Sequence, residues 1–285
     1  MNIRPIFDRM LLREDDENPL GYTARDRACI GVVGLSAGAG VSTLIFSMAR
    51  YIANLKTRTP TVLELSDGDE GICGWNYDVI GADRRFADRE YLSCYRRMEE
   101  CRGVAGVANM DEGINWMLRL PSERALALDP QQMTSLIGNA EGDVILCDFS
   151  ARLGSGLADE DARLDCLKKL LRDMTLIVPV VDPAPSKLLG GHKRLSMLKE
   201  LEAASHSVLY VINKFGKGVN KRELYDYLKP RRKTVIGLID PDELCEAEYN
   251  CKNPYAMPAV KRAATAAIET VLAAAGVIRN PEPQA

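Results

Sequence analysis

The residues best suited to chemistry form a glycine-rich stretch near the start of this 285-residue chain, where residues 34–43 read GLSAGAGVST. Glycines let a backbone turn sharply and point successive N–H groups toward one centre. An amphipathic helix is predicted to begin within the stretch, and the first N–H groups of a helix attract anions. The pattern therefore predicts a phosphate cradle, formed by Gly34, Gly38, Ala39, Gly40, Val41, Ser42 and Thr43.

The stretch agrees in part with the phosphate-loop pattern G-x-x-x-x-G-K-[ST], which requires a strand before it and a helix after it. Gly40 and Ser42 match, and the Ser42 hydroxyl stands where such a loop binds Mg²⁺. The first glycine of the pattern falls on Leu35, one residue after Gly34, and Val41 occupies the lysine position. The alternative is a tight turn between strand and helix, whose glycines serve packing alone.

The elements around this loop follow from the hydrophobic pattern. Short apolar runs alternate with longer helical patterns, as in βαβ units that build a mostly parallel sheet. Runs such as LIVPVV at 176–181 are apolar on both faces, which a buried parallel strand requires. We predict a doubly wound α/β fold, with helices on both sheet faces and seven strands at residues 28–34, 61–65, 114–120, 143–149, 175–181, 207–213 and 234–239.

Between the strands, apolar residues recur at a spacing near that of an α-helix. The predicted helices span residues 42–55, 129–139, 159–174, 186–204, 221–228 and 260–275. The predicted domain covers 28–276 and is followed by a tail at 277–285. An N-terminal extension at 1–27 opens with helical spacing. It forms a helix that docks on a membrane or partner, a helix packed on the domain, or a partly disordered tail. Residues 68–109 are predicted to add helices beside the site.

Composition bounds the classes of function. The net charge of −3 provides no global positive field that would attract nucleic acid or anionic lipid. No stretch has the length of a signal-peptide core or a membrane span, so we expect a cytoplasmic protein that reaches the membrane periphery only through a partner. The eight cysteines include no C-x-x-C pair, which favours reduced thiols over a metal site.

In this context the loop resembles that of the MinD/ParA family of P-loop ATPases, which reads K-G-G-x-G-K-T-T. Aligned residue by residue, the signature lysine of the family falls on Ser36, and its phosphate-loop lysine falls on Val41. Ala37 replaces the first glycine of the motif. The loop is most similar to the TadZ/CpaE-like pilus-assembly branch, where a small residue also replaces the phosphate-loop lysine, although that branch usually keeps the signature lysine.

Two acidic strands extend the resemblance. Residues 62–66 are similar to the strand that carries D-x-D in the family, whose second aspartate helps to place the attacking water. That position is Ser66 here, and Asp67 or Asp69 is the available substitute. Residues 144–152 are similar to the strand that ends in D-x-x-[AP]-G, which implies that Asp148 is the Mg²⁺-associated acid. Arg152 replaces the glycine of that motif.

The remaining matches lie toward the C-terminus, so that the resemblance covers residues 28 to about 275. Residues 180–186 resemble a strand-to-helix element, and residues 237–242 resemble the last strand and its I-P-D/E turn at Pro241. Asn213 stands where the family contacts adenine. The pattern N-K-x-D of guanine-specific enzymes also begins at Asn213, but Gly216 supplies no carboxylate, so adenine is preferred.

The missing lysines affect hydrolysis more than binding. A cation at the transferred phosphate stabilises the transition state, and loss of one preorganised donor costs about 2.7–4 kcal/mol. Backbone N–H groups, Mg²⁺ on Ser42 and Asp148, and adenine contacts would still bind ATP. We therefore expect a nucleotide-binding protein with little or no ATP hydrolysis. One alternative is an ATP-dependent dimeric switch in which Lys187, Arg152 or a partner's cation replaces the lysine; another is a ligase-like enzyme, for which the sequence shows no polar pocket.

Partners follow from the resemblance and from one charged segment. The family implies a homodimer and a protein partner in a localisation or assembly system, related to pili or secretion. Residues 214–233 contain eight cations against two acids, and such a segment suits DNA, acidic lipid or an acidic partner. We prefer a solvated helix and loop, because no base-reading motif accompanies the cations.

Overall fold

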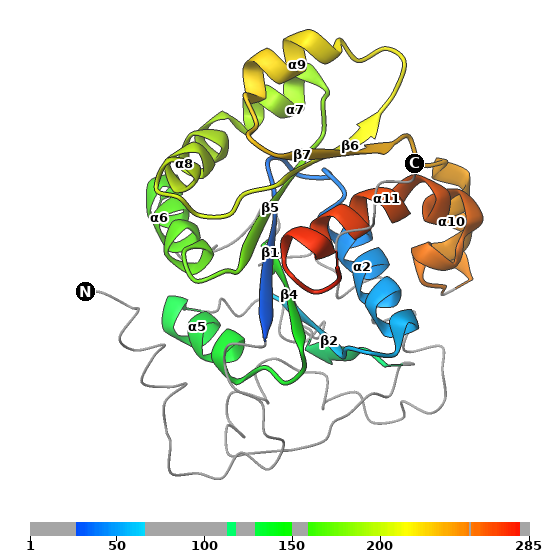
Figure 1. Ribbon diagram of the computed structural model, residues 1–285. Helices are drawn as coiled ribbons and strands as arrows, with labels where there is room; N and C mark the ends of the chain where they lie inside the picture. The colour runs from blue at the N-terminus through cyan, green and yellow to red at the C-terminus, as the bar shows by residue number, and fades with distance from the viewer. Residues whose placement is uncertain (1–26, 66–112, 118–128, 150–158, 251, 280–285) are drawn as a thin grey trace, which may run out of the picture.

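The computed structural model describes residues 27–65, 113–117, 129–149, 159–250 and 252–279. These residues form a seven-stranded sheet with helices on both faces (Figure 1), which confirms the predicted α/β fold. Residues 1–26 of the predicted extension and the 68–109 segment lie outside the described residues. The strands are β1 (Ala28–Gly34), β2 (Pro60–Glu64), β3 (Asn115–Met117), β4 (Val144–Phe149), β5 (Leu176–Val181), β6 (Tyr210–Phe215) and β7 (Lys233–Gly237).

Strand β1 lies at the centre of the sheet, whose order is β3-β2-β4-β1-β5-β6-β7. Each strand pair of the described residues is parallel, so this sheet is parallel throughout rather than mostly parallel. The chain builds one half of the sheet after β1 and then crosses to β5 on the other side. In open parallel sheets, ligands bind at the carboxyl ends of the strands where the order reverses. That position is the end of β1, where the glycine-rich loop begins.

The helices follow the predicted pattern with one break and one addition. The predicted helix 186–204 is divided at Gly191, and a further helix and a 3₁₀ turn follow β7, where the sequence predicts only a turn. The helical elements are α2 (Val41–Leu55), α5 (Pro130–Asn139), α6 (Glu160–Leu171), α7 (Pro185–Gly190), α8 (His192–Ala203), α9 (Lys221–Leu228), α10 (Pro241–Tyr249), η4 (Pro254–Ala256) and α11 (Pro258–Ala274).

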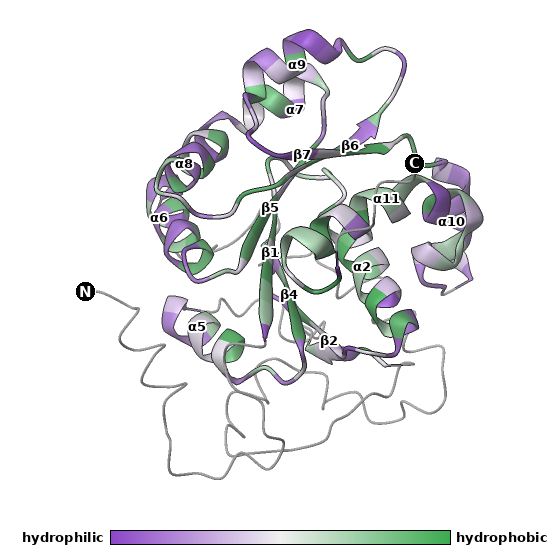
Figure 2. Ribbon diagram, viewed as in Figure 1, coloured by the Kyte–Doolittle hydropathy of each residue, from purple (hydrophilic) through white to green (hydrophobic). Residues whose placement is uncertain are grey.

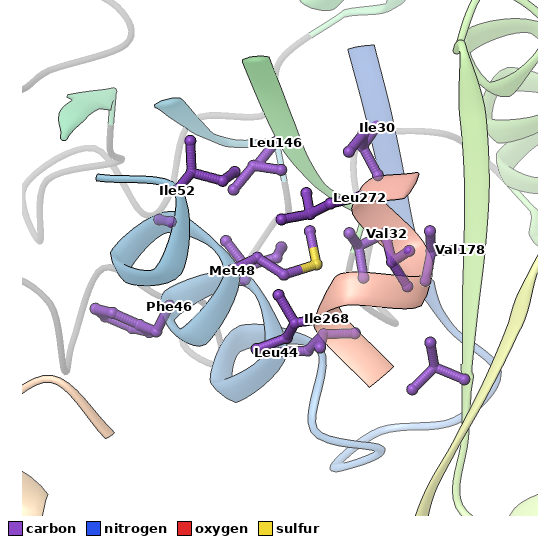
Figure 3. Packing of buried hydrophobic residues seen from close by; sticks show 14 of the residues in the cluster. Ile30, Val32, Leu44, Phe46, Met48, Ile52, Leu146, Val178, Ile268 and Leu272 are labelled. Atoms are coloured by element: carbon purple, nitrogen blue, oxygen red, sulfur yellow. The ribbon is translucent and has the colours of Figure 1, made fainter. Parts of the chain in front are cut away.

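Alternating side chains of the strands fill two cores, one on each face of the sheet. Ile30 and Leu146 belong to the first core, which packs against α2 and α11 (Figure 3). Val33 and Ile145 belong to the second core, which packs against α5, α6, α8 and α9. Figure 2 shows hydrophobic residues concentrated in β4 and β5. Because burial of one such side chain contributes about 1.5–3 kcal/mol, the two cores hold the loop-bearing edge rigidly.

Local sequence signals explain where several helices begin. Asp129 caps α5, because its side chain accepts hydrogen bonds from the N–H groups of Gln131 and Gln132 at 2.8 Å. The Gln132 side chain accepts in return from the N–H of Asp129, which completes a capping box. Helix α10 begins at Pro241, where the missing N–H of proline costs no helical hydrogen bond. Among the helices of the described residues, none combines the length and apolarity of a transmembrane segment.

Candidate functional site

The glycine-rich loop connects β1 to α2 at the carboxyl edge of the sheet. Gly38 and Gly40 adopt φ values of 73° and 94°, in the left-handed region that favours glycine. A side chain at Gly40 would place its Cβ 2.1 Å from Nδ2 of Asn213. Glycine at position 40 is therefore required by the backbone conformation and by a close neighbour.

The loop is shaped to present the N-terminus of α2. The N–H of Leu35 donates to the carbonyl of Val180 at 3.0 Å, which continues the sheet pairing past β1. The N–H of Ala39 closes the turn onto the carbonyl of Ser36 at 3.3 Å. The N-cap residue Gly40 makes no side-chain cap for α2. The N-cap side chain therefore offers no acceptor to the first N–H groups of α2, which is the arrangement that the predicted phosphate cradle needs.

A hydroxyl and two acids meet beside the start of α2. Ser42 Oγ donates to Oδ2 of Asp148 at 3.3 Å. Asp148 is fully buried on β4, and the buried Glu64 is its register neighbour on β2. These oxygens suit Mg²⁺, which takes one or two carboxylates from a protein and its other ligands from phosphates and water. In the described part of the chain, no three His, Cys, Asp or Glu side chains are grouped closely enough to hold a metal ion.

Glu64 is absent from the residues predicted for the site. Its signal in the sequence is an acid at the end of an otherwise uncharged strand, PTVLE. Acids are seldom fully buried unless they are paired or functional, and Glu64 is 1% exposed. Its register places it beside Asp148 on the face of the sheet that α2 covers.

Neither position of the missing lysines supplies a cation. Val41 is 6% exposed and belongs to the first core. Its Cγ2 lies 3.1 Å from where a Cβ on Gly34 would stand. Ser36 Oγ is buried and makes no hydrogen bond to the described residues. Ser66, Asp67 and Arg152 lie outside the described residues, so the structure does not place the other predicted groups of catalysis.

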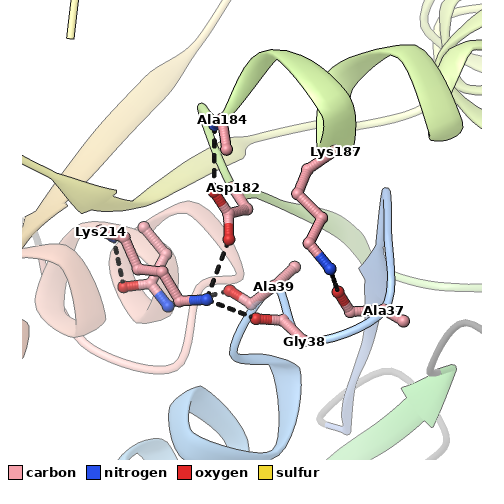
Figure 4. A network of polar contacts seen from close by, with 8 residues as sticks. Ala37, Gly38, Ala39, Asp182, Ala184, Lys187 and Lys214 are labelled. Atoms are coloured by element: carbon pink, nitrogen blue, oxygen red, sulfur yellow. Dashed lines mark hydrogen bonds and ion pairs between the residues drawn. The ribbon is translucent and has the colours of Figure 1, made fainter. Parts of the chain in front are cut away.

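Two lysines from distant segments reach the loop instead (Figure 4). Lys187 on α7 donates its Nζ to the carbonyl of Ala37 at 3.0 Å. Lys214 on β6 donates its Nζ to the carbonyl of Gly38 at 2.7 Å. Lys187 is a predicted substitute cation, whereas Lys214 appears in the sequence analysis as part of the N-K-x-D comparison and of a basic segment.

Asp182, which follows the last residue of β5, forms an ion pair with Lys214 on β6. Its Oδ2 lies 2.9 Å from the Nζ of Lys214, and its Oδ1 accepts from the N–H of Ala184 at 3.1 Å. Burial by itself raises the pKa of Asp182, but the hydrogen bonds from Lys214 and Ala184 and the charge of Lys187 outweigh burial. The pKa of Asp182 is therefore below its ordinary value, and the carboxylate is ionised at neutral pH.

Asn213 holds the loop from the next strand. Its Nδ2 donates to the carbonyl of Ala39 at 2.9 Å, and its Oδ1 accepts from the backbone N–H of Lys214 at 2.8 Å. Lys214 has a φ of 52°, so this bond stabilises a left-handed turn. The contacts of Asn213 and Pro241 with adenine stay predictions.

Thr43, the last residue of the predicted cradle, lies half-buried in the first turn of α2.

Comparison with solved structures places this fold among the MinD and ParA ATPases, and no family model or curated protein sequence matches the chain. A ParA family ATPase from Chlorobium tepidum is 13% identical, with a TM-score of 0.59 over 87% of this chain and 99% of its own. A putative plasmid partition protein from Borrelia burgdorferi, bound to AMPPNP, is 15% identical, with a TM-score of 0.62 over 87% and 98%. MinD from Pyrococcus horikoshii, complexed with Mg-ADP, is 16% identical, with a TM-score of 0.61 over 88% and 98%.

These identities are low, so the likeness establishes a shared fold. The chain is thus an α/β protein with the fold of the MinD and ParA nucleotide-binding ATPases. Its glycine-rich loop lies between the central strand β1 and helix α2, which is the strand-loop-helix context that the phosphate-loop pattern requires.

Proposed function

We propose that this chain binds a nucleotide and acts as a localisation or assembly factor, related to pili or secretion, with little or no ATP hydrolysis. The observation that carries the proposal is a loop that keeps its cradle without its cation. Gly38 and Gly40 have left-handed φ values, and Ser42 bonds to Asp148. Val41, at the lysine position, is buried in the first core.

The residues present fit ATP and Mg²⁺ as ligands. A cradle of backbone N–H groups at the start of α2 suits phosphates, because it provides donors and the positive end of a helix dipole. Ser42 and Asp148 would hold Mg²⁺, and Glu64 adds negative charge beside them. The similar structures from Borrelia and Pyrococcus contain AMPPNP and Mg-ADP, which supports nucleotide as the ligand class.

Slow hydrolysis follows from the uncharged loop positions. Phosphoryl transfer depends on fixed positive charge at the transferred phosphate, and Ser36 and Val41 provide none. By analogy with one lost stabilising donor, the rate falls about 10²–10³-fold relative to a complete site. Nucleotide binding then serves to change which partner the chain recognises rather than to drive hydrolysis. We propose a homodimer that recruits a protein partner in the cytoplasm or at the membrane periphery.

Thermal unfolding with nucleotides and a turnover assay test this function. We expect millimolar Mg-ATP or Mg-ADP to raise the melting temperature by about 5–10 °C, since saturation at 100 times Kd adds about 2.7 kcal/mol. GTP should stabilise less. Asp148→Asn should reduce the stabilisation, whereas Asp165→Asn, on the exposed side of α6, should leave it unchanged. Rapid Mg²⁺-dependent ATP turnover that Asp148→Asn abolishes would contradict the proposal.

The alternative is an ATP-dependent dimeric switch that uses a substitute cation. The position of Lys187, with its Nζ 3.0 Å from a loop carbonyl, favours this alternative. It predicts ATP turnover that is lost in Lys187→Met. It also predicts that turnover rises with dimerisation, which light scattering with and without Mg-ATP measures. Val41→Lys distinguishes the two functions, because it should increase turnover strongly only in a chain that lacks a working cation.

A further inference from the structure

Three carbonyl oxygens at the start of the loop accept hydrogen bonds from cations. These cations come from α7, α8 and β6, which lie next to the loop but far from it in sequence. Each cation donates to a different carbonyl oxygen of residues 34–38. We call this set the collar: it consists of Lys187, Lys214 and Arg194, which donate to Ala37, Gly38 and Gly34 at 3.0, 2.7 and 2.8 Å.

The collar carries more positive charge than its neighbours balance. Within the described ranges, Asp182 lies 2.9 Å from the Nζ of Lys214 and neutralises part of the charge of the two lysines. The charge of Glu160 also acts on Arg194, but Glu160 is itself bonded to Lys193 at 2.7 Å. Lys187 and Lys214 together with Asp182 therefore leave a net positive charge beside the loop, although the loop contains no charged residue of its own.

The geometry of the peptide group lets a cation on a loop carbonyl affect the N–H on the opposite side of the same peptide. A trans peptide points its C=O and its N–H in opposite directions. The peptide between Ala37 and Gly38 thus turns its N–H away from Lys187. Lys214 polarises the peptide between Gly38 and Ala39, whose N–H donates to the carbonyl of Ser36 at 3.3 Å, so the charge of Lys214 reaches the loop through its field rather than through that donor. A cation on the carbonyl strengthens the N–H of the same peptide as a donor, and its field acts across the few ångströms of the loop.

We propose that Lys187 and Lys214 supply the positive charge that binds the phosphates of a nucleoside di- or triphosphate at this loop. Lys187 acts through the peptide between Ala37 and Gly38, and Lys214 acts through its field. Both are positioning residues, and together they replace electrostatically the lysines absent at positions 36 and 41. Arg194 anchors the start of the loop. Asp182 opposes the effect, because it neutralises part of the charge of Lys214. The inference rests on the proposed nucleotide binding and adds the source of its affinity.

Calorimetric titration of the full chain with Mg-ADP and with Mg-pyrophosphate tests the collar. Lys187→Met and Lys214→Met should each raise Kd about 3–10-fold at about 0.05 M KCl. The loss should shrink at about 0.5 M KCl, because salt screens the charge. The matched control is Lys169→Met, an exposed lysine near the end of α6 at the opposite edge of the sheet, which should change Kd by less than about twofold.

Three further variants separate charge from shape. Lys187→Arg and Lys214→Arg keep the charge, so their Kd should stay within about threefold of the wild type. Asp182→Asn removes the opposing charge and keeps a carbonyl oxygen for the N–H of Ala184. It should lower Kd about 2–5-fold, since Lys214 then acts without its counterion. A loop that merely lost its shape would bind more weakly.

The outcomes distinguish the two proposals. The collar is overturned, with nucleotide binding intact, if the methionine variants bind as tightly as the wild type, if their losses are equal at both salt concentrations, or if Asp182→Asn weakens binding. A wild-type chain that binds neither ligand overturns both proposals. Urea unfolding checks that each variant is folded. If a methionine variant is unfolded, the Kd values of the arginine variants and of Asp182→Asn decide whether the collar proposal holds.

Discussion

At the scale of single residues, the site depends on a position that has no side chain. Gly40 has a φ of 94°, and a Cβ at this position would stand 2.1 Å from the Nδ2 of Asn213. Gly38 has a φ of 73°, but a Cβ there would meet no atom within 4 Å. The two glycines therefore serve the loop for different reasons: Gly38 for its backbone conformation alone, and Gly40 for conformation and for the contact that holds the loop to β6.

Alanine substitution separates these reasons. Gly38→Ala should destabilise by about 1–2 kcal/mol, the cost of a left-handed conformation. Gly40→Ala should cost about 1–3 kcal/mol more, because the clash displaces the Asn213 carboxamide. Urea unfolding monitored by circular dichroism measures both. Equal losses for the two variants would show that the approach of Asn213 to Gly40 does not constrain the loop.

At the scale of elements, the division between α7 and α8 positions the loop. The chain bends at Gly191, and a Cβ there would stand 2.7 Å from the carbonyl oxygen of Leu35. This close approach brings α7 and α8 against the loop, so that Lys187 and Arg194 reach its carbonyls from two helices. The spacing predicts a continuous helix over 186–204, whereas the structure divides it at this glycine.

Adjacent glycines provide a matched test of this packing. Gly191→Ala should destabilise by about 1–3 kcal/mol and weaken nucleotide binding, because its methyl group pushes the backbone of Leu35. Gly190→Ala lies one residue earlier, where a Cβ would meet nothing within 4 Å, and should be neutral or stabilise by up to about 0.5 kcal/mol. The measurements are urea unfolding and titration with Mg-ADP. The packing argument fails if the two variants behave alike.

At the scale of the whole molecule, the parallel sheet makes its centre the most protected part. Strands β1, β4 and β5 lie in the middle of the strand order and are buried between two helical layers. Strand β7 is an edge strand, and its residues Lys233 and Val235 are exposed. The loop therefore begins from a central, buried strand, and we expect this packing to limit how far its donors move.

Hydrogen exchange measured by mass spectrometry tests this gradient. Amides of β1, β4 and β5 should exchange only by global unfolding, whereas amides of β7 should exchange through local opening at lower free energy. Mg-ADP should slow exchange in residues 35–44 and leave β7 unchanged. Protection of β7 equal to that of β1 would contradict the predicted order of stability.

Much of the fold could be predicted from the sequence. Strand β1 and helix α9 have the predicted bounds, because apolar runs and helical spacing are local signals. Strand β6 begins at Tyr210, three residues later than predicted, since its pairing with β7 sets its register. Helix α10 was missed because its local pattern is that of a turn followed by acidic residues.

The sequence by itself determined the cradle: glycines at fixed spacing and a helix start, each of which acts over a few residues of chain. Asp148 was expected from its motif, but it meets Ser42 only because β4 pairs with β1. Only the tertiary structure decided how the loop is charged. Lys187 and Lys214 lie about 150 and 176 residues from the carbonyls they bond, and Glu64 lies beside Asp148 only because β2 pairs with β4. The physical reason is that a charge acts through space, so its neighbours are set by strand order and helix packing rather than by position in the chain.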